Sequence, residues 1–450
     1  MAIVIVTDTW EPKPALYLFI FVSSLLSLFL APYFSKSPSK TLSLFDAGSV
    51  SPPFLRFQRS FLFAYSLASV IEGLGSIFGD FEYVQHGIGR EGMALSLSAG
   101  SAASLFVGSF LGVLFDVIGQ RKSCMFFYAL HLFVGIMKGV TKTPNSWTSI
   151  SLALASSSLS FSFEAWMVHE HEKLGFRQDL LNTTFWLMTF FGSASLIGSQ
   201  VFANLLMRNA EKGIVNISLS ASLLAMISII YIRNSWSGGQ LSSTIGNYRA
   251  SFSALILSDK KIWLLAWAQA CLHFSVVIFW TLWAPIIVAD GREVYLAMLY
   301  PSFVGSQMLG STIVPWLLNG PLSLYMEDCL AYAFVAAGVA LSIVAYDYQE
   351  VGFLVGLFCI FHACIGMALP SLARLRTMYV PNEFRGGMIS LSLGPANAAI
   401  LIVLIQGGYY QNLENSTILA VAAFGLFSAG VCIYYLKKWS KQPQRSWHKS

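Results

Sequence analysis

Apolar stretches long enough to cross a lipid bilayer recur along the whole chain, and they constrain its fold more than any other feature. Only 11% of the 450 residues are charged, against roughly 25% in soluble domains. A helix needs about 20 apolar residues to cross the hydrocarbon core. Runs such as "ILAVAAFGLFSAGVCIYYL" are continuous, whereas the strands of a membrane barrel alternate between apolar and polar residues. We therefore predict a multi-pass membrane protein built from helices.

Thirteen such stretches can be placed, and short loops between them hold nearly all of the ionisable side chains. We predict spans over residues 15–33, 60–80, 94–115, 123–141, 148–168, 183–206, 214–232, 262–288, 296–318, 329–346, 351–373, 386–408 and 416–436. The leader of the first span contains Asp8, Glu11 and Lys13, whereas a cleavable signal peptide begins with a basic segment. The first span is therefore expected to stay in the protein as an anchor.

The basic residues are divided unevenly between the two sides of the membrane. If the N-terminus faces outward and the spans alternate, 20 of the 27 Lys and Arg residues fall on the side that holds loop 34–59, the stretch 233–261 and the C-terminus. Cytoplasmic loops carry such an excess, so we predict that this side is cytoplasmic. The net charge of +5 then reflects membrane orientation, and no nucleic-acid partner is expected.

A hydrophilic stretch divides the spans that follow the first into two sets of six. We predict an anchor helix and cytoplasmic loop over residues 1–50, a six-helix bundle over 51–233, a cytoplasmic linker over 234–261, a second six-helix bundle over 262–436 and a basic tail over 437–450. Two six-helix halves joined by a cytoplasmic linker are the layout of the major facilitator superfamily. The predicted fold class is all-α integral membrane, with that fold, two pseudo-symmetric bundles and one extra N-terminal helix.

A segment between the third and fourth spans has the spacing of a helix-contact motif. It runs from Gly112 to Lys122, "GVLFDVIGQRK", and resembles the superfamily's loop motif GxxxDxxGRR/K. A small Gly112 lets two helices approach closely, Asp116 can sit at the positive N-terminal end of a facing helix, and Arg121 can bridge to a carboxylate. Alternatively, Arg121 and Lys122 are only charges that set the topology.

The second half repeats this pattern only in part, as "PNEFRG" at Pro381 to Gly386. We expect the two segments together to form a gate at the cytoplasmic ends of the helices. The predicted gate residues are Gly112, Asp116, Gly119, Arg121, Lys122, Glu164, Arg376 and Arg385.

Further stretches, in order along the chain, resemble the molybdate-anion transporter family within this superfamily. They are "PFLRFQ", "DVIGQRKSC", "FEAWMVHEHEK", "LSDKKIWLLAWAQ" and "LPSLARLR", and the resemblance covers about residues 53–435. It implies a carrier of a small oxyanion, molybdate. The chain departs from the family after Glu72, where it has "GLGSIFGDFEY", and at His273, where the family tends to have Glu. Both departures fall where substrate contacts are expected.

The superfamily resemblance implies that the first, fourth, seventh and tenth core helices line a central cavity. Each of these helices has an ionisable residue, namely Glu72, Glu164, His273 and His362. Ionisable groups inside a membrane are costly, so each is a functional hypothesis by default, although a histidine can equally be a packing partner. Glu72 is the first candidate for proton coupling, and His131, on a peripheral helix, is expected to pack. The predicted substrate- and proton-binding residues are Glu72, His273, His362, Gln269, Trp283 and Asn397.

The segment "HEHEK", from His169 to Lys173, could suggest a metal site. His169 and His171 are two residues apart, so on a helix they point to opposite faces, whereas a zinc-binding pair is spaced i, i+4. We therefore expect an interfacial border and no metal or other cofactor. Glu164, about one turn inside this border, is predicted to form an ion pair with Arg121 in the outward-open state, and this pair is expected to break as the halves rock. Alternatively, the pair is a static salt bridge that aids insertion.

The leading hypothesis is a secondary transporter that moves a small anion by rocking two halves about a site near mid-membrane. The segment GxxxxGK[ST] is absent, so ATP is not expected to drive it. A proton-coupled sugar or organic-acid carrier and a non-transporting sensor or scaffold are the alternatives, and an intramembrane enzyme is disfavoured because no nucleophile and base can be paired. The expected partners are the substrate anion and the membrane lipid. The protein is expected to act as a monomer in a plasma membrane or an endomembrane.

Overall fold

The computed structural model describes residues 10–30, 52–76, 88–141, 145–207, 213–236, 245–319, 324–346, 350–410 and 412–441. Loop residues 34–51, the "GDFEY" part of the turn after the second span, residues 237–244 of the expected linker and the tail beyond residue 441 lie outside them.

The described residues of the predicted spans are helical, apart from single turn residues at Val288 and Leu393. The first half of the chain forms α1 (Pro14–Leu30), α2 (Pro52–Ser76), α4 (Arg90–Ala103), α5 (Ser109–Ile118), α6 (Gln120–Thr141), α7 (Ser146–Lys173), α8 (Gln178–Leu206) and α9 (Gly213–Ser235). A π-helical turn, Ser104–Gly108, joins α4 to α5, so these two form one continuous element.

The second half repeats the pattern of long helices. It forms α11 (Lys260–Ile287), α12 (Leu296–Asn319), α13 (Met326–Tyr346), α14 (Val351–Tyr379), α15 (Arg385–Ser392), α16 (Gly394–Val403) and α17 (Asn415–Lys441). The predicted span 386–408 is divided at Leu393 into α15 and α16, because Gly394 and Pro395 begin a new helix there and proline is favoured in the first turn of a helix. A π-helical turn, Leu404–Tyr409, extends α16.

Nine of the described helical segments are long and apolar enough to cross a membrane, by length and composition alone. They are Glu91–Ile118, Gln120–Thr141, Gln178–Leu206, Asn216–Ser235, Lys260–Ile287, Met326–Tyr346, Val351–Tyr379, Asn382–Tyr409 and Asn415–Ser440. Helix α1 is a shorter apolar helix.

Among the described residues, one α-helix lies outside the predicted spans, α10 (Ile245–Ser258), in the expected linker. Its side chains Tyr248 and Phe252 are buried against Val117 and Phe384. Tyr248, Phe252 and Leu255 are spaced i, i+4, i+7, which is the pattern of one helix face. This spacing could have revealed α10, but the surrounding polar residues obscured it.

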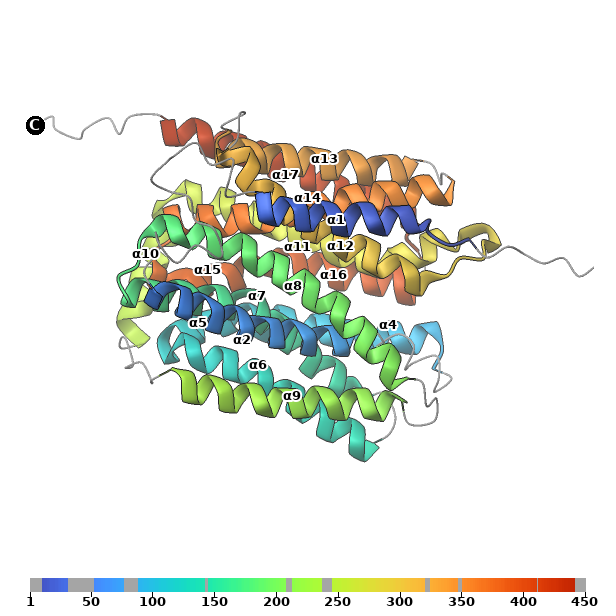
Figure 1. The fold of residues 1–450 in the computed structure, drawn as a ribbon, viewed down its shortest axis with the longest axis horizontal. Coiled ribbons are helices and arrows are strands. Elements are labelled where there is room, and N and C mark those ends of the chain that lie inside the picture. Colours follow the sequence, from blue (N-terminus) through green and yellow to red (C-terminus); the bar gives the residue numbers. More distant parts are fainter. Residues whose placement is uncertain are drawn as a thin grey trace, which may run out of the picture.

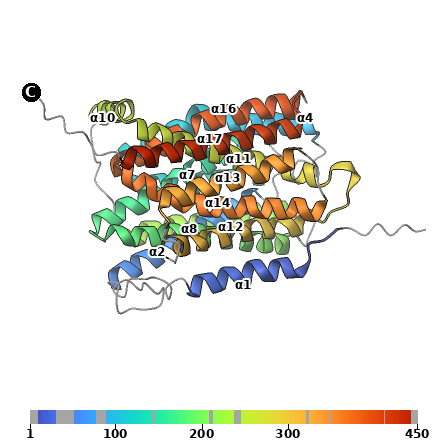
Figure 2. The ribbon, with the colours of Figure 1, turned by 90° about the horizontal axis from the view of Figure 1, so that it is seen from above.

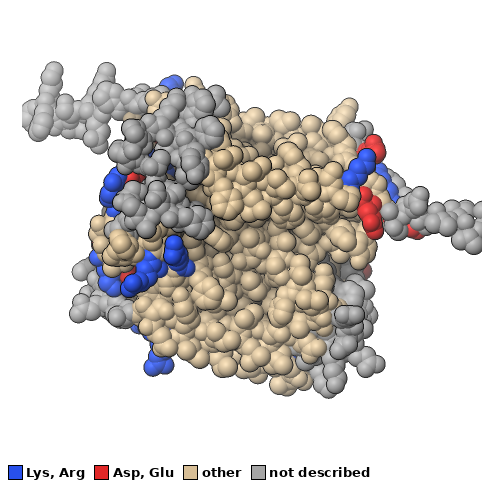
Figure 3. Space-filling view, in the orientation of Figure 1, with Lys and Arg blue, Asp and Glu red and all other residues tan. Residues whose placement is uncertain are grey.

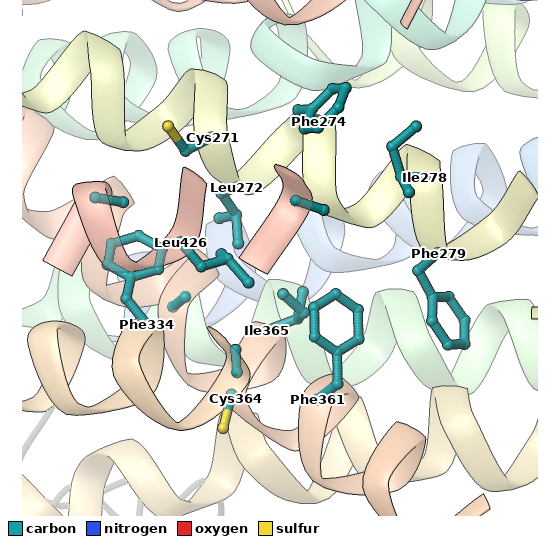
Figure 4. Packing of buried hydrophobic residues seen from close by; sticks show 14 of the residues in the cluster. Cys271, Leu272, Phe274, Ile278, Phe279, Phe334, Phe361, Cys364, Ile365 and Leu426 are labelled. Atoms are coloured by element: carbon teal, nitrogen blue, oxygen red, sulfur yellow. The ribbon is translucent and has the colours of Figure 1, made fainter. Parts of the chain in front are cut away.

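The two sets of helices lie beside each other, and α1 lies with the second set (Figure 1). One buried cluster is built mainly from α2 and α6–α9 and another mainly from α11–α17. Figure 4 shows the second cluster, in which Phe279, Phe361 and Leu426 come from three different helices. Between the sets, α8 packs against α12 and α14, α5 against α15, and α4 against α16.

Helix α1 packs on the outside of α12, at the edge of the bundle (Figure 2). Ile20 is buried against Gly305, and Ser27 donates a hydrogen bond to the Thr312 carbonyl (3.2 Å). Many of its other apolar side chains, such as Leu18, Phe19 and Leu26, are exposed, as expected of a helix that faces lipid.

Charged side chains gather at the two ends of the bundle, and the face between them is almost free of charge (Figure 3). We call the end at which α5 and α17 end and α10 lies the basic end. It carries the α5–α6 turn with Arg121 and Lys122 and the C-terminal part of α17 with Lys437 and Lys438. This is the end that the charge distribution predicts to be cytoplasmic.

Candidate functional site at the seam of the two halves

Asp116, at the C-terminal end of α5, binds the first turn of a helix from the opposite half. Its carboxylate accepts hydrogen bonds from the backbone N–H groups of Gly386 (3.1 Å) and Gly387 (2.6 Å) at the start of α15. Gln120 also donates to it. An anion at a helix N-terminus is favourable because the unpaired N–H groups and the helix dipole point toward it. The predicted place for Asp116 is confirmed.

Gly112 is the position at which the two halves approach most tightly in this region. A methyl group added there would overlap the carbonyl oxygen of Gly386 and the hydroxyl of Ser390, both in α15. A methyl added at Gly386 would in turn overlap the Asp116 carboxylate. The close helix approach expected of Gly112 is thus confirmed.

Helix α10 completes this contact from the third side. The Tyr248 hydroxyl donates a hydrogen bond to Asp116 (2.8 Å), and its ring stacks on Phe252 and packs edge-on against Phe384. Burial, and then the nearby Asp116 carboxylate, raise the pKa of Tyr248 above its ordinary value. The phenol therefore stays protonated and remains a donor throughout the physiological pH range.

Glu164 of α7 forms the second contact between the halves. Its carboxylate accepts from both Nε (2.8 Å) and Nη2 of Arg376 on α14, a bidentate pair, and from Nη1 of Arg385 on α15 (3.3 Å). Arg376 also donates to the side-chain oxygen of Gln269 on α11. The side chains of Arg376, Arg385 and Glu164 are only 6%, 0% and 11% exposed. This is a buried, charge-assisted network that joins four helices.

The predicted pairing of Glu164 with Arg121 is wrong. Arg121 donates instead to the backbone carbonyl of Trp236, beyond the end of α9, while Glu164 is already bound by Arg376 and Arg385. Gly119 has φ of 119°, a conformation that favours glycine, and it makes the sharp turn from α5 to α6. Arg121 and Lys122 follow this turn, at the start of α6.

Glu72 of α2 has an unpredicted partner, His131. The carboxylate lies 3.3 Å from Nε2 of His131 on α6, whose side chain is 2% exposed. His131 also packs edge-on against Phe127, so the expected packing role is only part of its environment. Glu72 is in addition close enough to Tyr300 of α12 for an electrostatic interaction.

His273 of α11 and Asn397 of α16 lie close enough for their side chains to interact. His273 lies one helical turn from Gln269 on α11, so both are on the same face of that helix. With Arg376 and Arg385, these residues form a polar stripe on the second half that leads from the basic end toward the middle of the bundle.

His362 and Trp283 lie elsewhere, within an aromatic cluster of the second half. The His362 ring is fully buried, stacked on Phe303 with centroids 5.8 Å apart and edge-on to Phe279 and Trp280. Neither of its ring nitrogens has a hydrogen-bond partner among the described residues. Trp283 packs against Phe303 and Trp280.

The predicted substrate residues therefore occupy separate environments. Gln269 belongs to the Glu164 network, His273 pairs with Asn397, Glu72 pairs with His131, and His362 sits among aromatic rings. Of the predicted gate residues, the structure brings together the acid Glu164 and the bases Arg376 and Arg385. They come from three helices, so sequence spacing alone could not show this contact. Whether each side chain binds substrate or protons stays a prediction.

The "HEHEK" segment has the two-faced arrangement that its spacing predicts. His169 is exposed, whereas His171 is buried against Phe54 and Phe176, with Nε2 2.9 Å from the carbonyl oxygen of Arg177. Glu172 accepts a hydrogen bond of 2.5 Å from Asn382, in the connection between α14 and α15. Across the described residues, no group of three or more His, Cys, Asp and Glu side chains could hold a metal ion.

Comparison with known proteins identifies both a sequence family and similar folds. Residues 34–359 match the family model MFS_5, described as sugar transporters with 12 TM. The Molybdate-anion transporter of Xenopus laevis is 26% identical over 431 residues, 93% of this chain and 94% of that protein. The Molybdate-anion transporter of Takifugu rubripes is 23% identical and covers 77% of this chain and 78% of its own length.

Solved transporters share the fold at low sequence identity. A bacterial homologue of the iron transporter ferroportin, in an outward-facing state, superposes with a TM-score of 0.66 at 18% identity, covering 85% of this chain and 100% of its own. A variant of the E. coli fucose:proton symporter gives a TM-score of 0.61 at 14% identity and covers 85% of this chain and 98% of its own. At these identities the likeness concerns the fold alone.

Proposed function

Since the chain belongs to the MFS_5 family, described as sugar transporters with 12 TM, we propose that this multi-pass membrane protein moves a small oxyanion, with molybdate as the first candidate. It has the predicted major facilitator fold with one helix added at the N-terminus. The family consists of transporters, and no enzyme activity is proposed. The relatives named Molybdate-anion transporter support the choice of substrate.

The observation that carries the proposal is the network of Glu164 with Arg376 and Arg385. The acid belongs to the first half and both bases to the second. Together with the contact of Asp116 on α15, it closes the seam at the basic end. In alternating access, one half rocks against the other around a fixed site, so these contacts form and break in each cycle. We propose that they are the cytoplasmic gate.

The substrate path in this proposal follows the polar stripe of the second half. Gln269, His273 and Asn397 offer amide and imidazole donors without a negative charge, as an anion requires. Their order along the seam, leading to Arg376, supports a path from mid-membrane to the gate. His362 and Trp283 are proposed to shape this half from within their aromatic cluster.

Glu72 and His131 are proposed as the proton-binding pair. Burial disfavours an isolated charge, and an acid and an imidazole within hydrogen-bond reach can share one proton. Protonation of Glu72 would also reduce the negative charge that an incoming anion meets. The carrier would then take up its anion together with protons.

The function is tested by uptake of radiolabelled molybdate into vesicles that contain the purified protein. We expect uptake above that of empty vesicles, reduced by excess unlabelled molybdate more than by sulfate, and unaffected by hexose sugars. Binding without uptake would instead support a sensor, and absence of both would overturn the proposed substrate.

A proton-coupled sugar or organic-acid carrier is the second candidate. The description of the MFS_5 family favours it, as does the aromatic cluster of Trp280, Trp283 and Tyr300, because sugar rings pack on aromatic side chains. Inhibition of the same vesicle uptake by hexoses, or uptake of a labelled hexose, would support this alternative.

The molecular organisation belongs to the proposal as well. We propose two bundles over residues 51–233 and 262–436, joined by the linker 234–261 and flanked by the anchor 1–50 and the tail 437–450, acting as a monomer. The basic end faces the cytoplasm of a plasma membrane or endomembrane.

A further inference from the structure

We infer that Arg376 and Arg385 form an oxyanion-binding subsite, which the Glu164 carboxylate occupies in this structure and which the transported anion occupies when the two halves part. The inference rests on the proposed oxyanion transport and deepens it. It assigns the anion a specific pair of side chains, and it makes Glu164 a competitor of the substrate.

The first argument is the geometry around Glu164. Its two oxygens are held by a bidentate Arg376 and by Arg385 at 3.3 Å. A planar guanidinium binds a carboxylate or a tetrahedral oxyanion through the same pair of parallel N–H groups. Two oxygens of a tetrahedral oxyanion can therefore take the places of the two carboxylate oxygens on Arg376.

The second argument is an unused donor. The Arg385 side chain is 0% exposed; its Nη1 donates to Glu164, its Nη2 donates to Asn382 (2.9 Å), and its Nε has no hydrogen-bond partner among the described residues. A buried N–H without an acceptor is costly. A carboxylate has only two oxygens, whereas a tetrahedral oxyanion has four and could satisfy this N–H as well.

The third argument is the division of charge between the halves. Both guanidinium groups belong to the second half, so they stay together when Glu164 moves away with the first half. Asp116, the other acid near Arg385, also belongs to the first half and is held by Gly386, Gly387 and Tyr248. Opening the basic end therefore leaves two adjacent guanidinium groups without their carboxylate partners. An anion from the proposed substrate path or from the cytoplasm can take the place of these carboxylates.

The same arrangement explains selection against a neutral solute. A sugar can accept hydrogen bonds from a guanidinium, but it brings no negative charge to replace Glu164. The subsite therefore favours small oxyanions, and it does so only in the state in which the halves have separated at this end.

The test is equilibrium binding of radiolabelled molybdate to the purified full-length protein in lipid nanodiscs. Glu164→Gln removes the competing charge and nearly preserves the side-chain volume, so we expect it to bind molybdate at least roughly tenfold more tightly than the wild type. The matched control is Asp328→Asn, which changes an acid to its amide in the pair with Lys437 (2.5 Å) at the same end but within one half. Its affinity should equal that of the wild type.

The double variant Glu164→Gln/Arg376→Gln should lose the added affinity. If it fails to fold, Glu164→Gln/Arg376→Lys keeps the charge but loses the bidentate geometry, and it should bind roughly tenfold more weakly than Glu164→Gln alone. Wild-type uptake of molybdate without tighter binding by Glu164→Gln would overturn the subsite and leave the proposed function intact. No uptake by the wild type and no binding by any variant would overturn both.

Discussion

At Gly112 the two halves meet with no space for a single methyl group, since the neighbouring atoms are the backbone carbonyl of Gly386 and the Ser390 hydroxyl. Backbone atoms cannot move aside as the end of a flexible side chain can. A larger residue at position 112 should therefore destabilise only the conformation in which the basic end is closed and α5 contacts α15.

Gly112→Ala should disfavour closure of the basic end. Overpacking in a tight contact typically costs about 1–3 kcal/mol, which corresponds to a shift in the open-to-closed ratio of roughly 5- to 150-fold. Hydrogen–deuterium exchange in α15 should rise, and substrate uptake should fall. Gly139→Ala on α6 is the control, because a methyl there meets no atom within 4 Å. If hydrogen–deuterium exchange in α15 is unchanged in both variants, the proposed role of Gly112 in the gate is contradicted.

The pair of Glu72 and His131 makes a separate prediction about pH. If the pair binds the coupled proton, wild-type uptake should rise as the pH falls from about 8 to about 5.5, because the concentration of the coupled proton then increases. Glu72→Gln cannot release or accept that proton, so its uptake should be lower and nearly independent of pH. Equal pH profiles for wild type and Glu72→Gln would exclude Glu72 as the coupling site.

Tyr248 does not provide an alternative origin for such a pH response. Its pKa is raised above the ordinary value by burial and by Asp116, and a raised phenol pKa means that the neutral, donating form persists at every pH below that value. Tyr248 therefore keeps the proton that it donates to Asp116 at both pH 5.5 and pH 8, since about 10 is already the unperturbed pKa of tyrosine.

At the scale of elements, the linker helix α10 connects the two halves and also touches the gate. Its apolar face covers Val117 of α5 and Phe384 just before α15, and Tyr248 reaches Asp116 between them. A helix that contacts both sides of the seam gains these contacts only when the seam is closed. We therefore expect α10 to stabilise the closed basic end.

Tyr248→Phe removes only the hydroxyl and should weaken this closure by about 1 kcal/mol, the usual net value of a hydrogen bond. Exchange of the α15 backbone amides should increase, and the transport rate should change with it. Ser253→Ala, an exposed position on the same helix, should leave both unchanged. A Tyr248→Phe protein that matches the wild type in exchange would show that α10 does not take part in the gate.

The elements differ in how far the sequence could predict them. Spans such as α13 and α14 are predictable because a long apolar run has few alternatives to a membrane helix. The division at Leu393 and the helix α10 were missed, since each depends on local features within a longer pattern. Within the site, Asp116 and Gly112 were placed correctly from a compact motif, whereas the partner of Glu164 was not.

The reason for that error is physical. Arg121, Arg376 and Arg385 are all basic residues at the same end of the bundle, and their distances from Glu164 depend on how the turn at Gly119 and the helices α14 and α15 are packed. One sequence contains no information on contacts between helices that are more than 200 residues apart. The pairing of Glu72 with His131 was missed because it depends on the relative rotation of α2 and α6.

For the whole molecule, the extra helix α1 places the start of the described chain at the end of the bundle opposite to the end of α17. The backbone N–H of Trp10 donates to the Glu293 carbonyl, and the Trp10 carbonyl accepts from the Tyr295 N–H, both in the connection between α11 and α12. Helix α17 ends at the opposite, basic end, where Lys437 binds Asp328. Figure 1 shows the same arrangement, with the C-terminal end of α17 on the side of α10.

The two ends of the chain should therefore lie on opposite sides of the membrane. An epitope tag on the C-terminus should be protected from antibody or protease until the membrane is permeabilised, and a tag on the N-terminus should be accessible from the other side. The same tagging on a protein that lacks residues 1–31 should place both tags on one side. Detection of both tags on one side in the full-length protein would contradict the orientation that the basic residues predict.

The division of Glu164 from Arg376 and Arg385 across the two halves also affects how the sequence can diverge. Loss of one partner from a buried ion pair costs about 3–5 kcal/mol, whereas simultaneous replacement of both sides by neutral residues costs far less. In an alignment of related carriers, substitutions at these three positions should therefore appear as correlated changes between helices encoded far apart, and a lone change should be rare.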